Sequence, residues 1–170
     1  GTDMMGRDML SRLIYGARTS VFISLVALGA GAFVGTALGI VAGYRGGKVD
    51  ALLMRIVDMV MGFPTILLAL IIVAIIGGAS ITNVIFAVAA TVWARFARQV
   101  RGEVLSLRER DFVTMAVIAN VSAPVIMWRH IFPNVANTMF IIMSLLVGQT
   151  ILLEASLSFL GVGVPPGDPA

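Results

Sequence analysis

Three long windows without a charged residue constrain what this chain can fold into more than any other feature. They cover residues 19–44, 59–94 and 131–153. A helix needs roughly 20 mostly apolar residues to cross about 30 Å of hydrocarbon, and each window is long enough. Hydrophobic residues make up 59% and charged residues 12% of the 170 residues, whereas soluble domains average about 45–50% and about 25%. We therefore predict an all-α fold, a polytopic membrane helical bundle.

The middle window is too long for one crossing, since a helix rises about 1.5 Å per residue. A cluster of turn-forming residues over 77–83 interrupts it. We interpret the window as two short helices joined by a tight hairpin. The chain is then a single membrane domain over residues 1–170. It has four predicted transmembrane helices, at about 19–44, 59–77, 81–100 and 131–153.

Basic residues gather in two loops that two predicted crossings separate. The loop after the first span holds three of the twelve Lys and Arg residues, and the loop over 95–129 holds six. Two crossings return the chain to the same side, and the positive-inside rule makes that side cytoplasmic. The N-terminal segment is then external. Its apolar face over 6–18 predicts a short helix lying flat at the interface, with a plain soluble connector as the alternative.

The two ends of the chain lead us to expect a fragment of a longer protein. The sequence opens on Gly1 in a charged stretch and closes on a run rich in Pro and Gly. Four spans between two external ends would suit a fragment that lacks at least one helix at each end.

Four glycines fall four residues apart on one face of the first span, at Gly31, Gly35, Gly39 and Gly43. Lipid provides no hydrophobic drive for helices to associate, and small residues at this spacing let two backbones approach closely. We expect this face to pack on another helix, in this chain or in a partner. The alternative is that glycine is simply frequent in membrane helices.

Two further residues are candidates for a pore or a hinge. Pro64 removes a backbone donor near the start of the second span and can bend the helix, although Pro is also common in the first turn of ordinary helices. Glu154 is the acidic residue of a long apolar run, and an ionisable group in the bilayer is a functional candidate. For Glu154 we favour the other interpretation, a position at the external end of the last span, near water.

Enzymatic and cofactor motifs are missing from the sequence. It contains no G-x-x-x-x-G-K-[ST] phosphate-binding loop, so we do not expect this chain to bind ATP by that mechanism. No cysteine occurs and His130 is the single histidine, so we expect no metal site and no catalytic residue. We also expect no cofactor. The formal net charge of only +3 does not suggest a nucleic-acid partner.

The cytoplasmic loop over about 101–130 is too long for a simple connector. Residues 112–118 read as a short apolar helix with Asp111 near its start, where a negative charge opposes the helix dipole. Asn120 can accept a left-handed C-terminal turn. A short apolar helix exposed in the cytoplasm needs a partner surface to cover it. The alternative is that this helix folds back on the membrane surface.

A series of short stretches gives the sequence a specific resemblance. It includes Arg-His-Ile-Phe-Pro-Asn at 129–134 and Glu-Ala-Ser-Leu-Ser-Phe-Leu-Gly-Val-Gly at 154–163. With these stretches in the family's order, the chain resembles the inner-membrane permease subunit of binding-protein-dependent ABC importers, in the dipeptide/oligopeptide/nickel group. The other matching stretches are 1–3, 6–8, 10–18, 42–44 with Gly46, Gly47 and Asp50, 53–55 with Asp58, 94–95 and 98–107.

The family's signature loop reads Glu-Ala-Ala, three residues, then Gly. It aligns with Thr114, Met115, Ala116 and Asn120, so only the second Ala is kept and the carboxylate is absent. The resemblance implies that this loop is a coupling helix that docks in a groove of an ATPase subunit. It assigns ATPase coupling to Asp111, Phe112, Val113, Thr114, Met115, Ala116 and Asn120.

The resemblance also implies the protein's location, partners and role. A multi-pass protein of the cell inner membrane would form half of the pore of an ATP-driven importer for peptides or similar small solutes. Its partners would be a second permease subunit in a heterodimer, two ATP-binding subunits that hydrolyse ATP, an external solute-binding protein and the lipid bilayer. The alternatives are a secondary transporter or channel without an ATPase, and a diverged structural subunit. Ion-coupled transport would often need intramembrane charges, for which only Glu154 qualifies.

Overall fold

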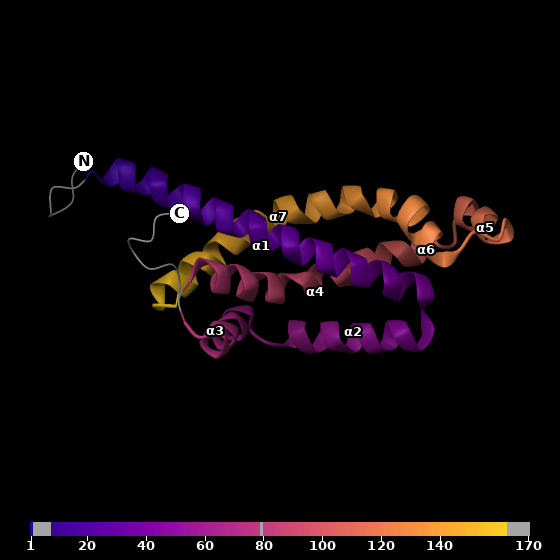
Figure 1. The fold of residues 1–170 in the computed structure, drawn as a ribbon, viewed down its shortest axis with the longest axis horizontal. Helices are drawn as coiled ribbons and strands as arrows, with labels where there is room; N and C mark the ends of the chain where they lie inside the picture. Colours follow the sequence, from indigo (N-terminus) through magenta and orange to yellow (C-terminus); the bar gives the residue numbers. More distant parts are fainter. Residues whose placement is uncertain (2–7, 79, 163–170) are drawn as a thin grey trace.

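Every regular element in the part of the chain that the computed structural model describes (residue 1, residues 8–78 and residues 80–162) is a helix, so the all-α prediction is confirmed. The fourth helix is central, because it contacts the first, second, third and last helices (Figure 1). In chain order the elements are α1 (Met9–Arg45), α2 (Gly47–Gly62), α3 (Thr65–Ile76), α4 (Ile81–Leu107), α5 (Asp111–Ile118), α6 (Ala123–Val125), the π-helical turn η1 (Ile126–Ile131) and α7 (Phe132–Phe159).

Helix α1 is a single helix of 37 residues. Asp8 caps its start, because the side chain accepts a hydrogen bond from the Ser11 backbone N–H at 3.1 Å. The helix continues through Arg18 without a break, and its first turns extend past the other helices (Figure 1). The prediction of a separate interfacial helix over 6–18 was therefore wrong: residues 9–18 are the first turns of α1, and residues 6 and 7 lie outside the described residues.

The glycine face of α1 lies against α4 of the same chain. A Cβ atom added at Gly39 would lie 2.7 Å from the Ala97 carbonyl oxygen, and one added at Gly43 would lie 2.7 Å from the Val104 Cβ atom. Gly31 and Gly35 meet α4 as closely further along the same seam. The two backbones therefore touch along this seam, and the gain is in van der Waals contact rather than in removal of apolar surface from water.

A break at Phe63 and Pro64 separates α2 from α3, and the two helices are bent by 97°. The residue before a proline is held to extended backbone, and Phe63 has φ −87° and ψ 143°. The segment predicted to span the membrane over 59–77 is therefore not one continuous helix. Residues 59–62 end α2, and α3 has only 12 residues, about 18 Å at 1.5 Å per residue, which is too short to cross the hydrocarbon alone.

The predicted hairpin between α3 and α4 is confirmed. Gly77 and Gly78 adopt positive φ angles of 109° and 110°, which glycine tolerates because it has no Cβ atom. Ser80 then caps α4 by accepting a hydrogen bond from the Asn83 N–H at 3.2 Å. The helix that follows continues to Leu107, seven residues past the predicted end of the third span.

The last helix starts earlier than the sequence indicated. Elements α6, η1 and α7 form one continuous helix over 123–159, whereas the predicted span covered 131–153. The π-helical turn ends two residues before Pro133, which has no backbone N–H to donate. Much of the predicted loop over 101–130 is consequently helical.

Two helices in the described ranges are long and apolar enough to cross a membrane, α1 and the continuous helix over 123–159. The pair of α2 and α3 adds a third if its two halves form one broken span. Helix α4 has 27 residues, with no charge before Arg95 and several charges after it. Four spans therefore stay a prediction.

Three apolar clusters occur in the described residues, and the smallest joins α2 to α4 around Val57 and Ala97. The two larger ones connect more of the bundle. One joins α1, α3, α4 and α7 around Leu28, Phe96 and Leu157. The other lies where α4, α5 and η1 meet, around Val104, Val113 and Ile131. The first would lie in lipid, where packing contacts carry the stability. In the second, burial from water adds a hydrophobic contribution.

Candidate coupling site

Helix α5 has well-defined ends, although it has only eight residues. Asp111 is its first residue, where a carboxylate favours the positive end of the helix dipole. After the last turn, the Val121 N–H donates to the Ala116 carbonyl and the Asn120 N–H donates to the Val117 carbonyl. These two bonds form a Schellman motif, which requires a left-handed residue, and Asn120 supplies it with φ 57°. The predicted left-handed turn at Asn120 is confirmed.

The two sides of α5 differ in what they contact. Val113 is 2% exposed and Ala116 is 8% exposed, and both belong to the apolar cluster with Val104 and Ile131. These two residues therefore fix α5 to the rest of the chain. The resemblance assigned ATPase coupling to residues 111–116 and to Asn120. Burial leaves two of these seven residues, Val113 and Ala116, little surface for contact with a partner.

The outer side of α5 is apolar and uncovered. Met115 is 67% exposed, Ile118 74%, Val117 54% and Phe112 40%. Large apolar side chains gathered on one short helix are typical of a surface that binds a partner. Helix α5 lies at the end of the bundle opposite to the start of α1 and the end of α7 (Figure 1).

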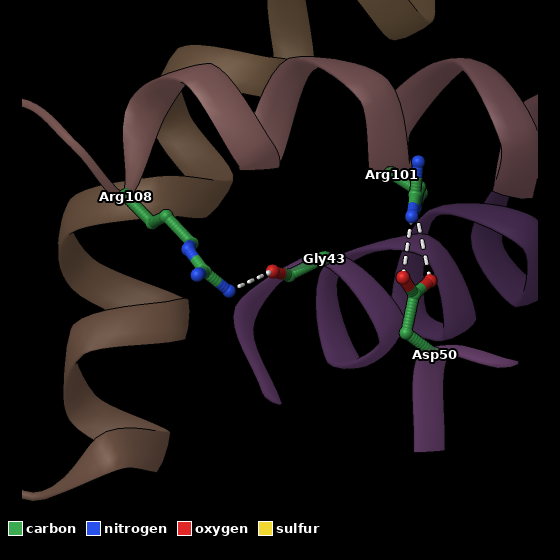
Figure 2. Close-up of polar contacts among 4 residues, drawn as sticks. All are labelled: Gly43, Asp50, Arg101 and Arg108. Atoms are coloured by element: carbon green, nitrogen blue, oxygen red, sulfur yellow. Dashed lines mark hydrogen bonds and ion pairs between the residues drawn. The ribbon is translucent and has the colours of Figure 1, made fainter. Parts of the chain in front are cut away.

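Two basic segments meet at this end of the bundle, as the charge pattern predicted. Arg101 of α4 pairs with Asp50 of α2, with Nε donating to Oδ1 at 2.9 Å and Nη2 contacting Oδ2 (Figure 2). Arg108, three residues before α5, donates from Nη1 to the Gly43 carbonyl at 3.3 Å. That carbonyl lies in the last turn of α1, where backbone acceptors lack a helical partner.

These contacts connect the segment before α5 to both α1 and α2. Arg98 also forms an ion pair with Asp58 of α2, but both side chains are about half exposed or more, so solvent weakens this pair. The Asp50–Arg101 pair is better protected, with side-chain exposures of 14% and 33%. We therefore take Asp50, Arg101 and Arg108 as the polar frame of the coupling site.

The hydrogen bond from Arg101 lowers the pKa of the Asp50 carboxyl below its ordinary value. Burial acts in the opposite direction, and the positive charges of Arg101 and Arg108 lower the pKa further. The same hydrogen bond raises the pKa of the Arg101 guanidinium. The pair is therefore fully charged at neutral pH.

Sequence reasoning located α5 but missed its polar frame. Asp50 and Arg101 are 51 residues apart, so no helical spacing relates them. Asp50 follows the first predicted span and Arg101 follows the third, and their opposite charges were the available signal. The two pore or hinge candidates lie elsewhere: Pro64 forms the break before α3, and Glu154 is on α7, five residues before its end.

The side chain of Glu154 is buried, which differs from the position near water that we favoured from the sequence. It is 4% exposed, and the Ser158 hydroxyl donates a hydrogen bond to Oε1 at 3.1 Å. Helix α7 continues past it to Phe159, which keeps the carboxyl among packed helices. This correction leaves Glu154 among the functional candidates, because an ionisable group inside a membrane bundle is costly to maintain.

Comparison with known proteins agrees with this geometry. The family described as the binding-protein-dependent transport system inner membrane component matches residues 35–170. The chain belongs to this family. Its membership places it among inner membrane proteins, in accord with the two long apolar helices.

Several curated relatives are similar over almost the whole chain. The glutathione transport system permease protein of Pectobacterium atrosepticum is 39% identical over 99% of this chain. The dipeptide transport system permease protein of Alkalihalophilus pseudofirmus is 41% identical over 96%, and a putative peptide transport system permease protein of Brucella suis is 42% identical over 98%. The chain spans 53 to 56% of the length of these relatives.

Proposed function

We propose that this inner membrane component is a permease subunit of an ATP-driven importer, and that it docks an ATPase subunit through α5. The observation that carries the proposal is the uncovered apolar side of α5, held by its buried residues at the end of the bundle where the two basic segments meet. In this proposal ATP hydrolysis belongs to a separate subunit. The membrane part of the chain forms half of a pore for peptides or similar small solutes.

The contacts around α5 suggest how the ATPase would act on the membrane helices. Val113 and Ala116 are buried against the chain, so α5 would move with the elements beneath it. The polar frame would pass that movement to α1 and α2, because Arg108 and Arg101 contact those helices. ATP could then shift the equilibrium between two states of the pore only to the extent that the ATPase binds the two states with different affinities.

The names of the relatives, permeases of glutathione, dipeptide and peptide transport systems, support a role as one component of a larger transport system. We propose a second permease subunit, forming a heterodimer with this one, two ATP-binding subunits and an external solute-binding protein. Pro64 is proposed as the hinge of the bent pair α2–α3. Glu154 is proposed to face the pore or the second permease.

Disulfide cross-linking in membranes tests the docking. The chain contains no cysteine, so Met115→Cys or Ile118→Cys adds a single thiol on the exposed side of α5. With a second cysteine in the groove of the ATPase, we expect a cross-link whose yield changes when ATP is added. Ala116→Cys is the matched control, because its side chain is 8% exposed and should cross-link poorly.

The opposite result has a clear meaning. If neither exposed position cross-links to the ATPase in correctly inserted protein, α5 does not dock it. The remaining interpretation is then a diverged structural subunit or ATPase-independent transport.

A further inference from the structure

A cavity lies between α3, α4 and α7 and contains a charged residue. Its volume is about 250 Å³, and its wall is formed by five apolar side chains and five polar ones, the polar ones being Thr65, Arg95, Gln149, Thr150 and Ser156. A smaller cavity of about 50 Å³ also borders Arg95, beside Thr65 and Thr91. Ligand sites in proteins have this character, with apolar walls and a few polar groups that orient the ligand.

Arg95, which is half-buried, contacts a residue of the last predicted span. Its Nη1 donates a hydrogen bond to Gln149 Oε1 at 2.7 Å, and Gln149 lies inside the charge-free window over 131–153. Gln149 lies four residues before the end of that window and ten residues before the end of α7 at Phe159. The charge pattern alone had grouped Arg95 with the cytoplasmic loop, whereas this contact places its guanidinium deeper.

The guanidinium of Arg95 has no carboxylate partner among residues 8–78 and 80–162. The next two arginines of α4 differ in this respect, because Arg98 pairs with Asp58 and Arg101 pairs with Asp50. A guanidinium carries five N–H donors, and Gln149 accepts from one of its nitrogens. Most of its donors therefore remain for another acceptor.

A cation without a carboxylate partner is costly within a predicted membrane span. Arginine is among the residues that are most costly to place inside a membrane helix, and such residues face a bundle interior or a water-filled cavity and mark substrate pathways. A neutral donor could hold α4 to α7 through Gln149 just as well. The positive charge therefore points to an anionic ligand rather than to helix packing.

We propose that Arg95, oriented by Gln149, binds a carboxylate of the transported solute inside the pore. A carboxylate fits the planar guanidinium with two parallel hydrogen bonds. The cavity of about 250 Å³ is smaller than the ~300 Å³ at which sites for whole drug-sized ligands begin, so it takes the carboxylate end of the solute. This inference rests on the proposed transport function and names one solute contact within it.

Uptake of a peptide and its amide tests the proposal. The complete importer, with its binding protein, is reconstituted in vesicles and given trialanine or the C-terminal amide of trialanine. The quantity compared between variants is the ratio of trialanine uptake to amide uptake. The binding protein is the same for every variant, so its own preference cancels in this comparison. Arg95→Gln should lower ATP-dependent uptake of trialanine by on the order of tenfold, as expected for loss of hydrogen bonds to a charged group. Uptake of the amide should change by less than about twofold.

Two variants sharpen the test. Arg55→Gln removes an exposed arginine of α2 that does not line the cavity, and it should leave the ratio unchanged. Arg95→Lys keeps the charge but loses the planar fork, so it should insert normally and lie between the wild type and Arg95→Gln in its ratio. It serves as the test if Arg95→Gln does not reach the membrane.

Each other outcome overturns a defined claim. Equal loss of both peptides in normally inserted Arg95→Gln would make Arg95 a residue that only packs helices, and no loss of either would make it dispensable. Both results overturn the carboxylate site while the wild type still transports. A wild-type importer with no ATP-dependent uptake of either peptide would instead overturn the proposed function, and this inference with it.

Discussion

At the scale of single residues, Gly35 is the position where α1 and α4 have least room. A Cβ atom there would lie 2.6 Å from the Phe96 Cβ atom and closer still to the Trp93 carbonyl oxygen. Gly35→Ala should therefore force the helices apart and lower the free energy of unfolding by about 1–3 kcal/mol, the usual cost of overpacking. Denaturation in detergent, followed by circular dichroism, measures the change.

Gly29 of the same helix is the matched control for this prediction. A Cβ atom at Gly29 would meet nothing within 4 Å, and alanine favours helix over glycine by about 1 kcal/mol. Gly29→Ala should be neutral or stabilising. Equal destabilisation by both substitutions would mean that close contact with α4 is not the reason for glycine at position 35.

Asn120 closes α5 with a left-handed backbone, at φ 57°. Because non-glycine residues other than Asn and Asp pay roughly 1–2 kcal/mol in this conformation, Asn120→Ala should loosen the Schellman turn and the helix before it. We expect faster proteolysis of the loop and a lower cross-link yield from Met115→Cys. Asn120→Gly restores the residue of the family signature and should match or exceed the wild type in both measurements. Equal behaviour of all three variants would contradict this role for the turn.

At the scale of elements, the Asp50–Arg101 pair connects α2 to α4. Asp50→Asn should weaken this connection by roughly 1 kcal/mol, since the pair is partly exposed and solvent screens it. The charge-swapped double variant with Asp50→Arg and Arg101→Asp should recover part of the loss. A double-mutant cycle on unfolding in detergent measures the coupling energy. A coupling energy of zero at neutral pH would show that the two helices are held by packing alone.

The pH dependence of this coupling has a definite sign. The pKa of Asp50 is lowered from the ordinary value of 3.8, so the folded state favours the ionised carboxylate. This contribution is fully present above about pH 4 and is lost as pH falls through the lowered pKa. The coupling energy should therefore be the same at pH 8 and at pH 5, and it should decrease only in stronger acid.

The short element α3 shows how local chemistry changes a span. Its 12 residues are all apolar or small, and periodicity could not reveal that the helix begins only after Pro64. The break arises because proline has no backbone N–H and restricts the residue before it. Pro64 was recognised as a site of bending, while the angle of 97° depends on how α3 packs on α4 and α7.

At the scale of the whole molecule, the two basic segments lie at one end and the α3–α4 hairpin at the other. Single cysteines at Lys48 and Met115 should therefore react with a membrane-impermeant maleimide only in inside-out vesicles. A cysteine at Ser80 should react only from the outside of intact cells. Labelling of Lys48→Cys and Met115→Cys from opposite sides would contradict the arrangement of the bundle.

Fold class and the position of the coupling helix could be predicted from the sequence, because they depend on local properties. Charge-free length gave the membrane helices, and Asp111 and Asn120 marked the two ends of α5. The start of α1 at Met9 could not be predicted in the same way, because charged residues such as Arg12 and Arg18 suggested an interfacial segment. Helix capping by Asp8 and continuous backbone hydrogen bonding extend the helix through them.

The sequence by itself determined that this protein is a helical membrane bundle with its basic loops on one side, since apolar length and charge act locally. Only the tertiary structure decided which helix the glycine face meets, which charges pair, and that Glu154 is buried while Arg95 contacts Gln149. These features join residues from distant parts of the chain. The physical reason is that the cost of a charge or a missing side chain depends on the atoms around it, and packing alone brings those atoms together.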